Sequence, residues 1–466
     1  MEIKHNDIEI SETDPFANCK LGRRSYAKVL TSIVDSFTDG FVLAINNEWG
    51  TGKTTFVKMW EQSLKNSGHK TLYFNAWEND FESNPLVAIM SELKSLNPNK
   101  NDETYKSLLK KGSLITKSIL PLVAKAIASK YIDSDILLDG IEKITESAAD
   151  ILEEEIDEYA AKKKGLIEFR SELKKYVENN NNSQPLIFIV DELDRCNPKY
   201  SVEVLEQIKH FFNVPGIVFV LSIDKKQLGN AVRGFYGSDL INADEYLRRF
   251  IDLEYILPSP SENLFSEYLY NYFKFDAFFG ATQRMSHYET SSDKDSFLIM
   301  ASHLFRKNNI NLRQQEKLFS YSRVVLNTFN PDQYVFPAVY LILIYIRFFA
   351  FDLYKSIRER NISLQELTIR VEELFPDEMD RLDSNFYTTT QARLVLFYFN
   401  FYKERYRNSQ LISFRGTERE EVLVKSNTNN ENLSNTIISL YNTRTSDMKL
   451  DYLLDRIDLV KELVKI

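Results

Sequence analysis

FVLAINNEWGTGKTTFVKMW, residues 41–60, is an apolar run followed by a glycine-containing turn and a helical pattern. The run Phe41 to Ile45 predicts a buried parallel strand, and a helix is expected from Lys53 through Leu64. A second strand is predicted at Thr71 to Asn75. These pieces form a βαβ unit with the turn between its first strand and its helix. The predicted fold class is therefore α/β, with a parallel sheet.

The turn NEWGTGKT, Asn47 to Thr54, matches the phosphate-loop pattern GxxxxGK[ST], except that Asn47 replaces the first glycine. Backbone N–H groups in such a loop face a phosphate, which requires glycine where a Cβ would block the approach, and the loop ends at a helix N-terminus that favours anions. Gly50 and Gly52 serve this purpose. A plain tight turn is the competing interpretation. The residues predicted to bind nucleotide are Asn47, Glu48, Trp49, Gly50, Thr51, Gly52, Lys53, Thr54 and Thr55.

A second motif argues against the plain turn. Leu186 to Asp194, LIFIVDELD, is an apolar strand that ends in consecutive carboxylates, as a Walker B segment does. Ligands of parallel sheets bind at this end of the strands, so two acids there are poorly explained as surface decoration. Asp191 is predicted to hold Mg²⁺ through water, and Glu192 to orient or deprotonate the water that attacks the γ-phosphate.

Lys53 and Thr54 complete the predicted chemistry of the loop. Lys53 is expected to reach the β- and γ-phosphate oxygens and to act in catalysis, and the Thr54 hydroxyl to ligate Mg²⁺. The next predicted strand ends with Ser222 and Asp224. Either is a candidate sensor of the γ-phosphate, although a polar residue at a strand end is commonly only a turn former.

Arginines near the predicted strands supply weaker candidates. Arg248 and Arg249 precede a further strand, and Arg195 follows the acidic pair. An arginine from a neighbouring subunit can neutralise γ-phosphate charge in the transition state, and Arg249 is the candidate for this role. Surface solvation or a carboxylate pair is the competing interpretation for each of the three arginines.

The pattern of strands and helices divides the chain into an α/β core, a helical insertion between the two motifs, and a helical remainder. Strand signals fade after Pro258, and aromatic-rich helical stretches follow. The predicted regions are the N-terminal part of the core at 1–104, a helical insertion at 105–183, the C-terminal part of the core at 184–261, a helical lid-like domain at 262–375 and a helical C-terminal region without an assigned role at 376–466.

Composition limits the partners and the compartment. The 466 residues carry a net charge of -9, which argues against a broadly basic surface for duplex DNA, although a local basic groove is compatible with an acidic total. Cys19 and Cys196 cannot form a disulfide framework, which fits a reducing cytosol. The first residues lack the cationic start and apolar run of a secretory signal. A cytoplasmic protein is therefore expected.

Two apolar segments are candidates for contact with a membrane. Gln333 to Ile346 is uncharged but shorter than the ~18 to 20 residues that span a bilayer, so a buried helix is predicted. Leu114 to Tyr131 is interrupted by three lysines at roughly helical spacing, which predicts an amphipathic helix. We expect no membrane-spanning segment, and peripheral contact with the inner face of the membrane stays open as an alternative.

FNAWEND at Phe74 to Asp80, EWGTGKT at Glu48 to Thr54 and IVDELDRCNP at Ile189 to Pro198 together resemble the KAP family of P-loop ATPases. Supporting similarities are YAKVLTSIV, FVLSIDKKQL, YLRRFIDLEYILPSP and NLRQQEKL, so the resemblance covers about residues 14–330. It implies an additional-strand core related to AAA+ and STAND proteins, with another strand between the two motif strands. It also implies that Arg313, in NLRQQEKL, is a lid arginine over the nucleotide.

The resemblance also bears on the nucleotide and the biology. GTP is disfavoured because no NKxD-like stretch follows the apolar strands, yet the choice of ATP rests mostly on the resemblance. Many family members carry membrane-spanning helices in the insertion, whereas this chain keeps three lysines there. Bacterial members include proteins that exclude phages, and animal members are membrane signalling scaffolds. The short plan of this chain is similar to the bacterial type, which implies phage defence by analogy.

Three functions are weighed. The first is Mg²⁺-dependent ATP binding and hydrolysis that drives a conformational switch, with protein partners or self-association, in bacterial antiphage defence or signalling. The second is an ATP-binding scaffold or adaptor whose turnover is incidental, and the Asp191–Glu192 pair favours the first over it. The third is an AAA+-like DNA-associated ATPase, which requires a basic face. Residues from 380 on mix acids with lysines and arginines, so nucleic acid binding has no support.

Overall fold

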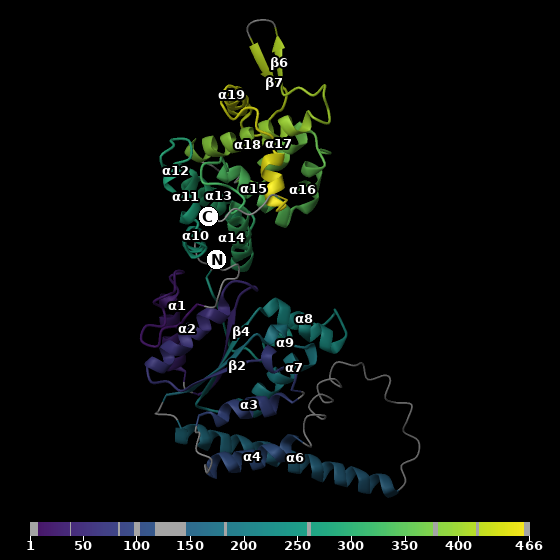
Figure 1. Cartoon of the computed structure of the whole chain (residues 1–466). Helices are drawn as coiled ribbons and strands as arrows, with labels where there is room; N and C mark the ends of the chain where they lie inside the picture. The colour runs from purple at the N-terminus through teal and green to yellow at the C-terminus, as the bar shows by residue number, and fades with distance from the viewer. Residues whose placement is uncertain are drawn as a thin grey trace. The chain divides into compact units, whose positions relative to one another are not determined.

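Two compact units make up the computed structural model, and each is described by itself. The N-terminal unit is Ile8–Ser259, and the C-terminal unit includes Pro260–Ile466. Figure 1 shows the elements of both along the chain. The structure describes residues 8–37, 39–82, 84–96, 103–116, 146–180, 184–258, 262–375, 381–415 and 419–460.

A five-stranded parallel sheet forms the centre of the N-terminal unit. Its strands lie in the order β2-β3-β4-β1-β5. β4 therefore separates the strand before the phosphate loop from the strand that ends in the paired carboxylates, as the KAP resemblance implies. The strands are β1 (Phe41–Asn46), β2 (Thr71–Asn75), β3 (Leu186–Asp191), β4 (Ile217–Ile223) and β5 (Leu253–Ile256).

Hydrophobic cores lie on both faces of this sheet because successive residues of a strand point to opposite sides. In β1, Val42 and Ala44 belong to one core, and Leu43 and Ile45 belong to the other. The near-continuous apolar runs of the sequence follow from this burial on both faces. The flanking helices are α1 (Arg24–Ser36), α2 (Lys53–Asn66), α3 (Pro85–Lys94), α7 (Pro198–Gln207), α8 (Lys225–Tyr236) and α9 (Ala243–Leu247), with short helical turns η1 (Trp77–Asn79), η3 (Leu193–Arg195) and η4 (Ile208–Phe212).

The predicted helical insertion lies between the two motifs and is seen as α4 (Glu103–Thr116) and α6 (Glu146–Asn180). These helices pack against each other, as Figure 1 shows. Leu108 and Phe169 join them to the core that contains Val42. From residue 117 on, the amphipathic helix predicted at 114–131 lies outside the described residues.

Helices build the C-terminal unit, as the fading strand signals predict, and one β-hairpin accompanies them. β6 (Ile412–Arg415) pairs antiparallel with β7 (Arg419–Val422). The prediction of a purely helical region missed this hairpin because strands of four residues are too short for their alternation to stand out. The helices are α10 (Glu262–Tyr272), α11 (Asp276–Phe279), α12 (Thr282–Met285), α13 (Asp293–Lys307), α14 (Leu312–Leu326), α15 (Pro337–Phe349), α16 (Phe351–Arg358), α17 (Leu364–Glu372), α18 (Arg381–Tyr402), α19 (Asn430–Tyr441) and α20 (Asp451–Ile457).

The helix α15 carries most of the uncharged run at 333–346. Every residue from Pro337 to Ile346 is buried in the protein, so the predicted buried helix is confirmed. Within the described part of the chain, no single helix is both long and apolar enough to cross a membrane. The helices α15 and α16 reach the required length and composition only as a pair bent by 120°.

The domain boundary predicted between residues 375 and 376 stays a prediction.

Candidate active site

The predicted phosphate loop connects β1 to α2 and has a backbone that favours glycine at two positions. Gly50 has φ 81° and Gly52 has φ 78°, both in the left-handed region that a Cβ disfavours. Gly52 directly precedes the first turn of α2. Turns of this kind direct successive backbone N–H groups toward a bound anion, and the helix N-terminus adds its positive end. The loop therefore has the backbone that phosphate binding requires.

Asn47 occupies the position where the loop pattern has its first glycine, and its side chain is engaged. Its Nδ2 donates to the carbonyl oxygen of Leu257 at 2.6 Å, and its Oδ1 accepts from the backbone N–H of Glu48 at 2.8 Å. Leu257 directly follows β5. The asparagine thus ties the start of the loop to the edge strand, which a glycine could not do.

Lys53 lies at the start of α2, and its side chain turns back over the loop. Its Nζ donates to the carbonyl oxygens of Asn47 at 2.6 Å and Glu48 at 2.9 Å. Burial lowers the pKa of Lys53, and the carboxylates of Asp194 and other acids oppose this change. The ammonium group is thereby held inside the loop, where phosphate oxygens can replace the carbonyl partners.

Asp191 ends β3 and is almost fully buried, with 1% of its surface exposed. Its Oδ2 accepts from the hydroxyl of Tyr73 at 2.8 Å, and its Oδ1 accepts from the backbone N–H of Glu192 at 3.0 Å. Burial and the neighbouring carboxylate raise the pKa of Tyr73 far above its ordinary value, so the hydroxyl stays a donor. Both carboxylate oxygens are held in fixed directions at the edge of the sheet.

Glu192 follows Asp191 in an unusual backbone conformation. Its φ of 61° lies in the left-handed region, which is uncommon for residues other than glycine and is often found at functional sites. Its carboxylate pairs with Nη1 of Arg195 at 2.7 Å and lies 3.5 Å from Nδ2 of Asn75. Burial raises the pKa of Glu192, and Arg195 acts in the opposite direction. The predicted base is thus positioned by Asn75, which had no predicted role, and by Arg195, which forms the carboxylate pair that was the competing interpretation for it.

Those two neighbours come from separate parts of the fold. Asn75 ends β2, and its Oδ1 accepts from the backbone N–H of Trp77 at 3.1 Å and of Glu78 at 3.3 Å. The guanidinium of Arg195 lies 5.4 Å from the centre of the Trp77 ring, which is half exposed. Asn75 and Trp77 both belong to FNAWEND. Asn75 could have been found from the sequence, because it is a polar residue at the carboxyl end of a predicted parallel strand, where ligands bind.

Asp194 joins the loop to two strands, and the sequence reading quoted it without a role. Its Oδ2 accepts from Nε1 of Trp49 and from the backbone N–H of Asp224, the latter at 3.0 Å. Burial raises the pKa of Asp194, and these hydrogen bonds act against that. Asp194 therefore fixes the indole of the loop against the ends of β3 and β4.

Arg23 is another site residue that the sequence analysis missed. Its Nη1 donates to the carbonyl oxygen of Gly52 at 2.9 Å, and its Nη2 donates to that of Thr51 at 2.6 Å. The side chain is buried, which lowers the pKa of Arg23 to about 10, and its Nε has no hydrogen-bond partner among the described residues. Nothing in the local sequence marks this contact because the two segments lie 28 and 29 residues apart.

The two sensor candidates at the end of β4 differ in their environment. Ser222 lies in register with Asp191 on one side and Ile45 on the other, and its buried hydroxyl has no hydrogen-bond partner within the described residues. Asp224 caps α8, because its Oδ1 accepts from the backbone N–H groups of the first helical turn. Ser222 therefore stays a sensor candidate, and the capping role accounts for Asp224.

The two threonines of the loop and the two candidate arginines lie in or beside three different helices. Thr54 and Thr55 are partly buried in the first turn of α2. Arg249 is exposed and lies two residues after the end of α9. Arg313 is exposed in the first turn of α14, which belongs to the other compact unit. Arg249 belongs to the same compact unit as the phosphate loop and Arg313 to the other, and both roles stay predictions.

The side chains available for Mg²⁺ are few, which suits this ion at a phosphate site. Within the described residues there is no group of three or more His, Cys, Asp and Glu side chains that could hold a metal. Mg²⁺ at such sites takes one or two protein ligands and fills its shell with phosphate oxygens and water. Thr54 and Asp191 fit that requirement.

Comparison with known proteins places this geometry in a family. Residues 23–328, more than half of the chain, match the model of the KAP family P-loop domain. No curated protein sequence matches the chain. Among solved structures it is similar to the Aeropyrum pernix ORC2 protein in its ADPNP-ADP complexes, with 15% identity, a TM-score of 0.30, and coverage of 91% of this chain and 95% of that chain. The family match shows that the chain belongs to the KAP family of P-loop NTPases, which are nucleotide-binding proteins.

Proposed function

We propose that this chain binds and hydrolyses ATP with Mg²⁺ and that turnover switches the conformation of its C-terminal unit. The observation that carries the proposal is the arrangement at the carboxyl end of one parallel sheet, where the charge of Lys53 interacts with Asp191, and Glu192 directly follows Asp191. An amine in a phosphate loop, together with two carboxylates at the end of the next strand but one in the same sheet, is the arrangement that nucleotide chemistry uses. The KAP family match supports the nucleotide class.

Each residue has a role in the proposed reaction. The loop N–H groups and Lys53 bind the phosphate oxygens, with the ammonium group exchanging its carbonyl partners for them. Thr54 and Asp191 hold Mg²⁺, which supplies positive charge to the phosphates when bound. Glu192 accepts a proton from the water that attacks the γ-phosphorus, as the bond to the bridging oxygen breaks and ADP leaves.

The ion pair of Glu192 with Arg195 favours a second candidate, an ATP-binding scaffold with incidental turnover. A carboxylate whose charge is committed to a guanidinium 2.7 Å away is a weaker proton acceptor than a free one. In the scaffold reading, ATP stabilises one conformation for a partner protein and is rarely hydrolysed. The ATPase is preferred because Asp191, with Glu192 directly after it, lies at the carboxyl end of the sheet and interacts with the charge of Lys53.

The deciding experiment measures ATP binding and hydrolysis separately. Lys53→Ala is expected to lose activity by about 100-fold or more, because it removes a charge that contacts the transition state. Glu192→Gln is expected to bind ATP without turnover. Lys65→Ala, in the last turn of the same helix, is the matched control and should behave as wild type. Wild-type binding with no hydrolysis that depends on Glu192 would instead establish the scaffold.

The biological setting is proposed from family membership. Bacterial KAP proteins include phage-excluding members, so we place this chain in antiphage defence or signalling, with protein partners or self-association. Plaque counts on a bacterial host that expresses wild type, Lys53→Ala or Lys65→Ala would test this. Protection that needs Lys53 and not Lys65 supports defence, and equal plaque counts on all three hosts argue against it.

A further inference from the structure

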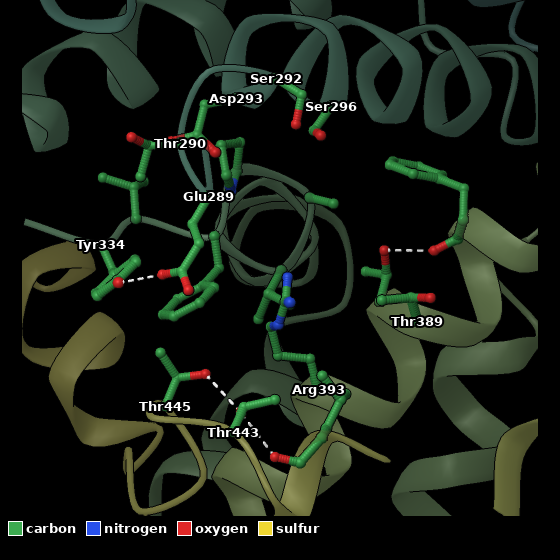
Figure 2. A pocket seen from close by; sticks show the side chains of 18 of the residues that line it. Glu289, Thr290, Ser292, Asp293, Ser296, Tyr334, Thr389, Arg393, Thr443 and Thr445 are labelled. Carbon is green, nitrogen blue, oxygen red and sulfur yellow. Dashed lines mark hydrogen bonds between the residues drawn. The ribbon is translucent and has the colours of Figure 1, made fainter. Parts of the chain in front are cut away.

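A cavity of about 450 Å³ lies within the C-terminal unit, and none of its lining residues is among those assigned to nucleotide chemistry. Its wall is formed by the segment before α13 and the first turn of that helix, the segment before α15, one face of α18 and the loop after α19. Figure 2 shows the side chains that surround it. This volume is within the range of pockets that hold small organic ligands.

Arg393, on α18, extends toward the middle of the labelled side chains in Figure 2. Its guanidinium lies 5.0 Å from the centre of the Phe336 ring. Its Nε is buried without a hydrogen-bond partner, and the hydrogen bonds and ion pairs of the described residues include none from Arg393. An arginine stays charged even where burial lowers its pKa, so this positive charge has no ion-pair or hydrogen-bond partner in the part of the chain that the structure describes.

The acids in the wall are already engaged by other groups. Asp293 forms an ion pair with Arg284, whose side chain is fully buried. Glu289 accepts a hydrogen bond from the hydroxyl of Tyr334, as Figure 2 shows. Asp293 and Glu289 are close enough to favour the charged form of Arg393 but do not form ion pairs with it. The charged group of the wall that is available to a ligand is therefore the cationic guanidinium of Arg393.

Hydroxyl groups add neutral donors beside this charge. Ser292 precedes α13, and its side chain does not cap that helix. The side chains of Ser292 and Ser296 lie across the hollow from Arg393, and Thr389 lies on the α18 side (Figure 2). Arginine together with serine and threonine hydroxyls is a donor set suited to phosphate or carboxylate oxygens.

We infer that this cavity binds a small organic anion whose phosphate or carboxylate group pairs with Arg393 and accepts hydrogen bonds from Ser296 and Thr389. The volume beyond the anionic group leaves room for the organic part, beside the aromatic ring of Phe336. This second site is independent of the proposed nucleotide chemistry. It gives the helical unit a ligand of its own.

The test uses the full chain carrying Lys53→Ala, so that the phosphate loop contributes little to anion binding. Inorganic phosphate and succinate are titrated separately by calorimetry and by chemical shifts. At least one probe is expected to bind, and Arg393→Gln in the same background should weaken it by about tenfold or more, because a charged hydrogen bond is lost. Binding of phosphate alone identifies a phosphorylated ligand, and binding of succinate alone identifies a carboxylate.

Controls separate loss of the site from loss of the fold. Arg370→Gln removes an exposed arginine that pairs with Glu373 in the same unit, and it should leave probe binding unchanged. Ser296→Ala and Thr389→Val keep Arg393 and should each weaken probe binding a few-fold. These two variants test the site if Arg393→Gln fails to fold. Binding that is equal in Arg393→Gln and in its parent overturns the proposal, as does the absence of binding by both probes.

Discussion

The carboxylate of Glu192 and the guanidinium of Arg195 lie 2.7 Å apart, and both side chains are largely buried. The two residues belong to one short turn after β3, in which Glu192 has a left-handed backbone. The proposed base of the reaction is therefore held by a cation from its own chain. Release of this pair is a step that turnover would require.

Arg195→Gln is expected to raise the basal rate of ATP hydrolysis at saturating ATP by about threefold to tenfold, because a partly buried ion pair of roughly 1 kcal/mol no longer competes for the Glu192 carboxylate. Steady-state phosphate release measures this rate. Arg248→Gln, which removes an exposed ion pair with Glu245, is the control and should leave the rate unchanged. A fall in rate would mean that Arg195 instead stabilises the transition state.

Asn47→Gly restores the glycine of the general loop pattern and is nevertheless expected to weaken ATP binding by up to about tenfold. The substitution removes the hydrogen bond to Leu257 and increases the freedom of the loop before it binds ATP, together worth about 1 to 1.4 kcal/mol. Calorimetric titration with ATP measures the effect. Asn47→Ala lacks the side-chain amide but restricts the backbone more than glycine does, so its ATP affinity should lie between those of wild type and Asn47→Gly. ATP affinity equal to wild type in Asn47→Gly would contradict this account.

Arg23→Met is expected to destabilise the N-terminal unit by about 2 kcal/mol, since two carbonyl groups of the phosphate loop lose their charged donors. Urea denaturation followed by the fluorescence of Trp60, a buried residue of that unit, measures this change. The neighbouring Arg24 forms only an exposed pair with Asp14, so Arg24→Met should change stability by less than about 1 kcal/mol. Equal effects of the two substitutions would contradict a special role for Arg23.

Glu206→Gln is expected to stabilise the protein at pH 8 and to lose that advantage by pH 5. Burial and the neighbouring Glu203 raise the pKa of Glu206 to about 7. The unfolded chain releases this proton at lower pH, so wild-type stability falls as pH rises from about 4.5 to 7, whereas the neutral glutamine does not titrate. With solvent screening, the gain at pH 8 is about 1 to 2 kcal/mol.

Urea midpoints of wild type and Glu206→Gln at the two pH values give this difference. Glu178→Gln changes an exposed glutamate paired with Lys174 and should show almost no pH-dependent difference from wild type. A gain for Glu206→Gln that is the same at pH 5 and pH 8 would show that the Glu206 carboxyl does not titrate in this range.

The parallel sheet could be predicted because its strands are apolar runs that end at recognisable motifs. The run at 41–45 and the LIFIV run before Asp191 are both strands in the structure, buried on both faces. The contacts that organise the site could not be predicted in the same way. Arg23 reaches the loop through folding of distant segments, and the Asn75–Glu192 contact joins residues 117 positions apart. Local patterns carry no information on such pairs.

The hydrogen bonds of Asp194 have a consequence for how the nucleotide state is communicated. Its carboxylate holds the Trp49 indole and also the backbone N–H of Asp224, and the Asp224 side chain caps α8. These contacts link the phosphate loop, the end of β4 and the start of an outer helix in one relay. If an incoming substrate displaced Trp49, these contacts would therefore transmit the displacement to α8. The position of that helix at the surface of the unit would then depend on whether the loop is occupied.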